Sequence, residues 1–410
     1  MSQNKRVVVT GMSGVSPMGK DWITTVSNLR AGKNFIGAID EWERFQGLNT
    51  RLGAAIHDFE MPKSFPRKKV RSMGRVSRLA AVATRQALED AGLLDDPVLT
   101  NGNTGIAYGS SIGSTGPFAA FGNMLNSGDC SGITATSYIQ MMAHTTAVNL
   151  SLFFELKGRV HTTSSACTSG SQGIGYAYEA IKHGYQKVMV AGGAEELCPT
   201  EAVVFDTLYA TSLKNDQPEM TPRPFDVSRD GLVIGEGAGT LILEELEHAQ
   251  ARGATIYAEL IGYGTNCDAQ HVTQPTSETM QVAMELALAD AGILADEVGY
   301  VCAHGTATER GDIAETQATQ ATFNRRVPIS SLKSYVGHTL GACGALEAWW
   351  AIEMMREGWF APTINLENVD PACGDLNYIT GQGLALDTDI VMSNNFAFGG
   401  INTSLIFKRW

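Results

Sequence analysis

Short apolar runs alternate with longer runs of helical spacing along the whole chain. The short runs predict strands at residues 6–10, 103–109, 187–191, 299–303, 327–330 and 389–393. The longer runs predict helices at residues 75–91, 141–156, 169–182, 277–290, 313–322 and 342–356. Because strands and helices alternate instead of separating into blocks, we expect an α/β protein with mostly central, buried sheets.

The order of these elements is weakly repeated. Residues 165–193 run from small residues through a helix and a strand to glycines, and residues 337–400 repeat that order with a longer middle. We therefore expect two similar α/β halves, residues 1–252 and residues 253–410. The glycine-containing stretch 253–265 is a plausible seam, but no low-complexity linker marks it, so we expect the halves to form one body.

Composition and charge narrow the class of protein. The chain has 410 residues, of which 44% are hydrophobic and 18% charged, so a large compact core is expected. A formal net charge of −13 argues against general nucleic-acid binding, which needs a positive surface. No signal peptide or membrane-length apolar run is evident.

The seven cysteines form an odd set without metal-binding spacing. This usage fits a reducing cytoplasm better than a disulfide scaffold, and it predicts no metal site.

A glycine-containing segment, residues 10–19, follows the first predicted strand. It superficially resembles a nucleotide-binding turn, but the acid expected about twenty residues later is missing and Pro17 complicates the turn. We interpret the segment as a tight structural turn.

Cys167 lies in a run of small residues, 164–171, directly before a helical pattern. At a helix N-terminus, the peptide dipoles and free N–H groups would favour its thiolate and could hold an oxyanion. The local pattern alone leaves open whether Cys167 is a nucleophile or a small buried residue.

Two of the eight histidines, His304 and His338, each follow a strand-like run beside a glycine. The ends of strands are where α/β sheets place chemistry. Lys333 lies just past a strand and before His338, while Asp312 and Glu315 begin the helix after His304. Acids in a first helical turn are commonly dipole partners, and that reading stays open for Asp312.

These motifs together resemble the β-ketoacyl-acyl-carrier-protein synthases. The similarity covers essentially the whole chain and rests on residues 164–171, 224–226, 229–231, 235–239, 304–308, 333–342 and 396–400. Thiolases pair Cys and His with a second Cys, and initiating synthases use His and Asn. This chain has His at both places and is therefore similar to the elongating class.

The resemblance implies a thiolase-like fold, two similar halves in a five-layer α/β/α/β/α arrangement, and a decarboxylative Claisen condensation. Cys167 would carry the acyl chain, with main-chain N–H groups of Cys167 and Phe398 as oxyanion hole. His304 and His338 would stabilise the enolate that forms when a malonyl-carrier thioester loses carbon dioxide. Lys333 would orient the site.

Further residues have supporting roles by the same resemblance. Glu315 matches a carboxylate that supports Lys333, and Thr306 and Thr308 match hydroxyls near the pantetheine arm. Ile112 and Phe396 match positions of the acyl pocket, although core packing also explains Ile112.

Phe398 matches a gatekeeping residue of the acyl pocket. Ala397 and Ile401 depart from the usual Gly and Thr of that loop, which puts its movement or its acyl preference in doubt.

A basic cluster at residues 67–75 stands out in this acidic chain, and a positive patch attracts an acidic partner. A solvated charge run is the alternative. Arg67, Lys68 and Arg71 match residues that dock the acidic acyl-carrier protein in the family.

We therefore expect a cytoplasmic dimer without a cofactor of its own, acting on substrates carried on the phosphopantetheine of acyl-carrier protein. The acyl chain, the pathway (fatty acid, polyketide or aryl polyene), and the choice between homodimer and heterodimer stay open. The alternative function is a non-condensing partner subunit, like the chain-length factors. Those subunits lack the nucleophilic Cys that this chain keeps.

Overall fold

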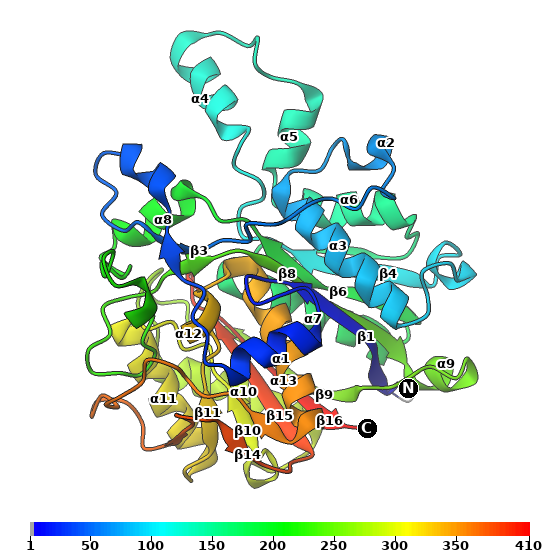
Figure 1. The fold of residues 1–410 in the computed structure, drawn as a ribbon. Helices are drawn as coiled ribbons and strands as arrows, with labels where there is room; N and C mark the ends of the chain where they lie inside the picture. Colours follow the sequence, from blue (N-terminus) through cyan, green and yellow to red (C-terminus); the bar gives the residue numbers. More distant parts are fainter. Residues whose placement is uncertain (1–3) are drawn as a thin grey trace.

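The chain folds into two α/β halves built on one plan (Figure 1). The computed structural model describes residues 4–410. The N-terminal half contains β1 (Val7–Val15), α1 (Trp22–Arg30), β2 (Gly37–Ala38), β3 (Leu52–Ala54), α2 (Arg67–Val70), α3 (Arg75–Asp90), β4 (Thr104–Gly109), α4 (Phe118–Ser127), α5 (Ala135–Met141), α6 (Thr145–Phe154), β5 (Val160–Thr162), α7 (Ser169–Lys182), β6 (Val188–Glu195), α8 (Pro199–Asp206), β7 (Ile234–Gly235), β8 (Gly237–Glu245) and α9 (Leu246–Ala251). The C-terminal half contains β9 (Ala258–Cys267), α10 (Ser277–Ala291), β10 (Tyr300–Cys302), α11 (Glu309–Phe323), β11 (Pro328–Ser330), α12 (Lys333–Val336), α13 (Cys343–Glu357), β12 (Trp359–Phe360), β13 (Asn377–Tyr378), β14 (Leu384–Ala385), β15 (Ile390–Phe396) and β16 (Ile401–Arg409).

The main strands of the two halves have the same order and the same directions. The order β5-β4-β6-β8-β1 in the first half corresponds to β11-β10-β15-β16-β9 in the second, with β13 added at the far edge. In both halves the first three strands are parallel and the last two are antiparallel additions. Strands β1 and β9 pair over Val7–Val9, which joins the halves into one sheet system. This repeat agrees with the expected pair of similar halves.

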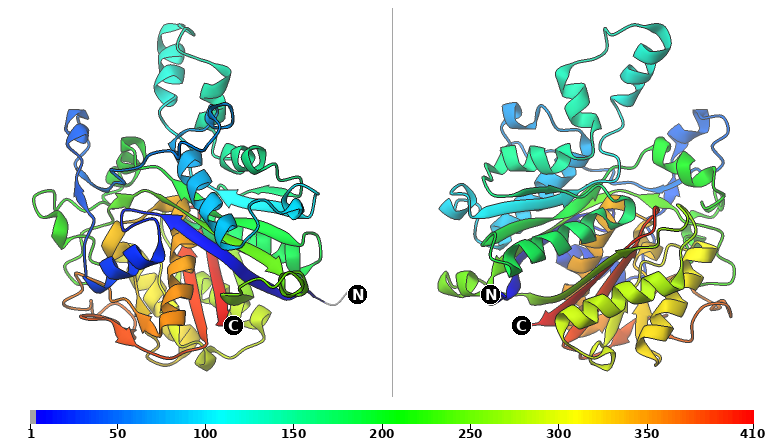
Figure 2. Two further views of the ribbon diagram at one scale, coloured as in Figure 1. Left: turned by 45° about the vertical axis from the view of Figure 1, so that its right-hand side comes forward. Right: turned by 180° about the vertical axis from the view of Figure 1, so that it is seen from behind.

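Helices and sheets alternate in five layers. Helices α3 and α6 pack on the outer face of the first half, and α10 and α11 pack on the outer face of the second (Figure 2). Helices α7 and α13 lie between the halves and contact strands of both. Strands β4 and β6 are buried along their whole length because helices cover both faces. The five-layer thiolase-like arrangement is confirmed.

Two glycines of β1 allow close packing on opposite faces of the strand. A Cβ on Gly11 would lie 2.3 Å from the carbonyl oxygen of Ala87 in α3, and one on Gly14 would lie 2.6 Å from Leu346 in α13. The prediction of a tight turn over residues 10–19 is wrong for most of that segment. The strand continues to Val15, and the turn is confined to Ser16–Gly19, which exchange two backbone hydrogen bonds.

Most predicted elements are present with shifted ends. The helix 169–182 is found with the predicted bounds, whereas the helix predicted at 141–156 is found as α6, which begins four residues later and ends two residues earlier. Helices α4 and α5 form an arm that stands away from the body (Figure 1). The expected seam, residues 253–265, is largely strand β9. Among residues 4–410, no helix is long and apolar enough to cross a bilayer.

Candidate active site

Cys167 lies at the entrance to the central helix α7. It sits in a 3-10 turn, Ala166–Thr168, that leads directly into the helix, and its side chain is buried. The preceding residue, Ala166, has a φ of 52°, which turns the chain sharply before the helix. The expected position of Cys167 at a helix N-terminus is confirmed.

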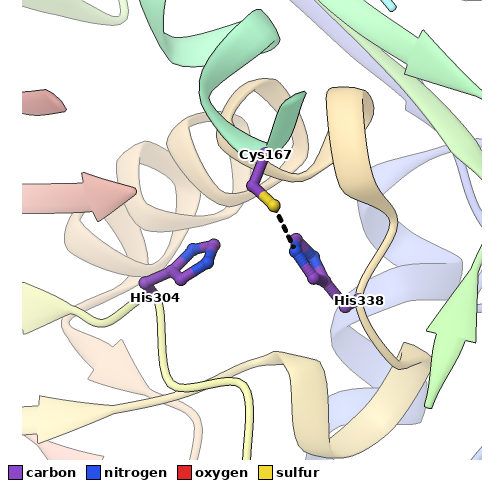
Figure 3. Close-up of side chains that lie close together, drawn as sticks. All are labelled: Cys167, His304 and His338. Atoms are coloured by element: carbon purple, nitrogen blue, oxygen red, sulfur yellow. Dashed lines mark hydrogen bonds between the residues drawn. The ribbon is translucent and has the colours of Figure 1, made fainter. Parts of the chain in front are cut away.

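His304 and His338 approach the thiol of Cys167 from the second half of the chain. His338 Nε2 lies 2.9 Å from Cys167 Sγ, and the two imidazole rings are 5.0 Å apart and nearly perpendicular (Figure 3). His304 follows β10, and His338 follows α12. The structure therefore joins three residues that are far apart in the sequence.

The tautomers of both imidazoles follow from their hydrogen bonds. The backbone N–H of Leu340 donates to His338 Nδ1 at 3.3 Å, and Asn395 Nδ2 lies 3.4 Å from His304 Nδ1. The orientation of the Asn395 amide is fixed because its Nδ2 also donates to Glu347 at 2.7 Å. Both rings accept at Nδ1, so each neutral ring carries its proton on Nε2. Two N–H donors thus face the thiol region.

Burial and one buried cation set the charge states. Burial, together with the positive charge of Lys333, lowers the pKa of both His304 and His338 well below the usual range, so both rings are neutral. Burial raises the pKa of Cys167 to about 11, against the lowering effects of the Phe398 N–H and Lys333. The sequence led us to expect a favoured thiolate, but burial outweighs the effect of the helix terminus, so the resting group is a thiol.

Lys333 is paired with Glu347 in the interior, and each side chain is only 2% exposed. Burial alone would lower the pKa of Lys333, but the adjacent Glu347 outweighs it and the net pKa is raised. Glu347 lies within the apolar helix α13, and our reading of the sequence missed it. An acid in an otherwise apolar helix face was the available signal.

Glu315 has a different partner from the one that the resemblance implied. Its carboxylate accepts the backbone N–H groups of His304 and Gly305, each at 2.7 Å. Glu315 therefore holds the loop that presents His304, while Glu347 pairs with Lys333. Asp312 holds the same region, because it accepts from the backbone of Phe225 at 2.7 Å and of Ala307 at 3.1 Å.

A cavity of about 530 Å³ leads to the thiol. Cys167, His304, His338, Thr306, Thr308, Phe396 and Phe398 are among its lining residues. The hydroxyls of Thr306 and Thr308 are 2.9 Å apart, and the ring of Phe396 lies 6.2 Å from that of His304. Ile112 is half-buried in the loop after β4 and is absent from this lining, so its acyl contact stays a prediction.

The Phe398 loop connects β15 and β16 beside the cavity. Gly399 and Gly400 have φ angles of 86° and 77°, whereas Ala397 does not have a positive φ. The departure at Ala397 therefore causes no backbone strain, because the left-handed positions are still glycines. The ring of Phe398 lies 5.0 Å from that of Phe205 in α8.

Cys167, His304 and His338 bring possible metal ligands within 4.8 Å of one another. The charge of Lys333, which already lowers the pKa of both imidazoles, also opposes a cation at this place. The donor set therefore fits thiol chemistry better than a resident metal.

The basic cluster divides into paired and unpaired residues. Lys69 pairs with Glu155 at 2.7 Å and Arg75 with Glu236 at 2.6 Å. Arg67, Lys68 and Arg71 are exposed, and within residues 4–410 none of the three forms an ion pair. These three lie on or next to α2, outside the lining of the cavity.

Comparisons with known proteins agree with this geometry. The family model for the beta-ketoacyl synthase N-terminal domain matches residues 4–249, and the model for the C-terminal domain matches residues 257–367. The 3-oxoacyl-[acyl-carrier-protein] synthase 2 of Synechocystis is 38% identical, with 100% of this chain and 99% of the relative covered. The enzyme of the same name from Staphylococcus aureus is 37% identical, with 100% of both chains covered.

Solved structures give the same result. A beta-ketoacyl synthase from Burkholderia phymatum is 61% identical with a TM-score of 0.98, and covers 99% of this chain and 100% of its own. The ishigamide ketosynthase/chain length factor is 30% identical with a TM-score of 0.91, with 99% and 100% covered.

Proposed function

Because this chain belongs to the β-ketoacyl synthase family, we propose that Cys167 carries the acyl chain that the enzyme condenses with malonyl-acyl-carrier protein. The enzyme is an acyltransferase of the 3-oxoacyl-[acyl-carrier-protein] synthase class, and acts in chain elongation without a cofactor of its own. The observation that carries the residue assignment is the 2.9 Å approach of His338 Nε2 to Cys167 Sγ, with His304 beside it.

In the first step, Cys167 takes the acyl group from the carrier. The sulfur attacks the thioester carbonyl, the bond to the pantetheine sulfur breaks, and the proton of the Cys167 thiol ends on the carrier thiol. The backbone N–H groups of Cys167 and Phe398, which already lower the thiol pKa, are suited to hold the developing oxyanion. This step uses backbone donors and leaves both imidazoles free.

In the second step, the two imidazoles stabilise the enolate. The malonyl thioester loses carbon dioxide, and its thioester oxygen becomes negative while it accepts from the Nε2–H groups of His304 and His338. The enolate carbon attacks the acyl carbonyl, and the bond to Cys167 breaks. The released thiolate takes a proton from solvent. Neutral imidazoles suit this role because both hold a proton to donate.

The acyl-carrier protein would dock on Arg67, Lys68 and Arg71. These residues are exposed and form no ion pairs within the described chain. Because the chain as a whole is acidic, an acidic carrier protein would be attracted to these three residues and repelled elsewhere.

A second subunit would pair along β5. This strand is at the edge of the sheet, and Val160 on it is 45% exposed, as expected of an edge that another copy covers. The subunit would be a second copy or a related chain, as the description of the ishigamide ketosynthase/chain length factor illustrates for that relative. The division at residues 252 and 253 stays a prediction.

A reducing compartment such as the cytoplasm suits this chemistry. All seven cysteines are free thiols, and Cys167 acts only in reduced form.

Mass spectrometry tests the assignment. Incubation with a panel of acyl-carrier thioesters is expected to acylate Cys167, and Cys167→Ala removes the adduct. No adduct with any donor would contradict the proposal. The alternative, a non-condensing partner subunit, would be supported if a complex containing Cys167→Ala kept full condensation.

A further inference from the structure

Glu201 is a buried acid without a strong hydrogen-bonding partner. It lies on α8, is 5% exposed, and within residues 4–410 neither carboxyl oxygen has a nitrogen or oxygen partner; the nearby thiol of Cys198 is at most a weak hydrogen-bonding neighbour. Buried polar groups are almost always satisfied, because leaving one unpaired is costly. The carboxyl of Glu201 therefore points to a polar ligand group that binds to it only when substrate is present.

The helix places Glu201 next to the acyl site. Glu201 and Phe205 are four residues apart and share one face of α8. Phe205 lines the cavity and packs against Phe398, and Ala202 belongs to the same buried apolar cluster as Cys167. Glu201 thus lies one helical turn beyond the cavity lining.

The neighbouring acids are satisfied, which distinguishes them from Glu201. Glu195 accepts from the backbone of Ser111 at 2.6 Å and of Gly341 at 3.1 Å. Glu196 accepts from the backbone and hydroxyl of Thr115 at 2.7 and 2.9 Å. Ser111 and Thr115 flank Ile112, the residue expected in the acyl pocket, so Glu195 and Glu196 border that loop, and both acids are close enough to Glu201 to raise its pKa.

The surroundings of Glu201 favour its neutral, protonated form. Burial, followed by the charge of Glu195, raises its pKa well above the usual range. A neutral carboxyl both donates and accepts a hydrogen bond, which matches a hydroxyl group. An alkyl end would leave both oxygens unsatisfied.

We propose that Glu201 recognises the far end of the acyl chain, and that the preferred chain carries a hydroxyl group there. This inference rests on the proposed function, because it requires an acyl chain on Cys167. It assigns Glu201 to specificity and gives it no part in bond making.

The test compares acyl-carrier thioesters of equal length with and without a terminal hydroxyl, over a series of lengths, with the Cys167 adduct measured by intact mass. At one length, the wild type is expected to acylate faster with the hydroxylated chain, by about tenfold, as one net hydrogen bond allows. Glu201→Leu abolishes or reverses the preference. Glu201→Gln, which still donates and accepts, keeps it.

Glu196→Gln is the matched control, because that acid already has its partners, and it is expected to keep the preference. A thermal melt establishes that each variant folds. Equal acylation by both chains at every length in the wild type would overturn the inference, as would a preference that survives Glu201→Leu. Failure of every donor to acylate Cys167 would instead overturn the proposed function.

Discussion

Lys333 and Glu347 form an ion pair in the interior of the protein, with each side chain 2% exposed. Glu347 also accepts from Asn395, and Asn395 contacts Nδ1 of His304. A buried charge pair is thus connected through one amide to an imidazole of the active site.

Removal of either member of this pair leaves an uncompensated buried charge. Lys333→Met is expected to lower the free energy of unfolding by about 3–5 kcal/mol. The double variant Lys333→Met/Glu347→Leu should recover most of that loss but not condensation, because the charge and the Asn395 contact are both gone. Urea denaturation and a condensation assay separate the effects. Unchanged stability in Lys333→Met would contradict the pairing.

A substitution of His304 should affect the decarboxylation step but not the acylation step. His304→Ala is expected to keep acylation of Cys167, since backbone N–H groups hold the first oxyanion. Loss of one enolate donor should slow decarboxylation by about 10²–10³-fold. Adduct mass and carbon dioxide release are the two measurements. Equal loss in both steps would argue against the assignment.

The thiol should react with a neutral alkylating agent faster as the pH rises towards about 11, the pKa to which burial raises Cys167. Lys333 lowers that pKa, so Lys333→Met is expected to shift the profile to still higher pH. The pH profile of alkylation, followed by mass, measures both. A plateau near neutral pH would show that the resting group is a thiolate.

Two glycines of the Phe398 loop make a matched pair. A Cβ on Gly399 would meet nothing within 4 Å, whereas one on Gly400 would lie 2.8 Å from Asp268 Cβ. Both have positive φ, so Gly399→Ala carries only backbone strain, about 1 kcal/mol, and Gly400→Ala carries that strain plus a clash. Acylation by a long chain should therefore slow more in Gly400→Ala. The opposite order would show that strain alone governs the loop.

Charge reversal at Arg67, Lys68 or Arg71 should raise the KM for the acyl-carrier protein with little change in kcat. The effect should shrink with added salt, because exposed charges are screened. Lys408→Glu, exposed on β16, is the control and should leave KM unchanged. Steady-state kinetics at two salt concentrations measure the change in KM. An equal rise in KM for the Lys408→Glu control would show that net charge, and not a docking site, causes the effect.

The sequence contained enough to propose the central residues of the site but not all of the residues that hold them in place. Cys167, His304, His338 and Lys333 were found because each lies in a short motif whose order and spacing resemble the family. Glu347 and Asn395 were missed because an acid in a helix and an amide in a strand have no distinctive neighbours. The partner expected for Lys333 was Glu315, which instead holds the His304 backbone.

The sequence by itself determined the alternation of strands and helices, which depends on local pattern, and it indicated Cys167, His304 and His338 through motifs that resemble a family. Only the tertiary structure decided the partner of Lys333, the tautomers of His304 and His338, and the protonation of Cys167. These depend on burial and on contacts between β10, α12, α13 and β15, which come together only when the two halves pack. The small-residue run placed Cys167 at the helix terminus, but burial decided that its resting form is the thiol.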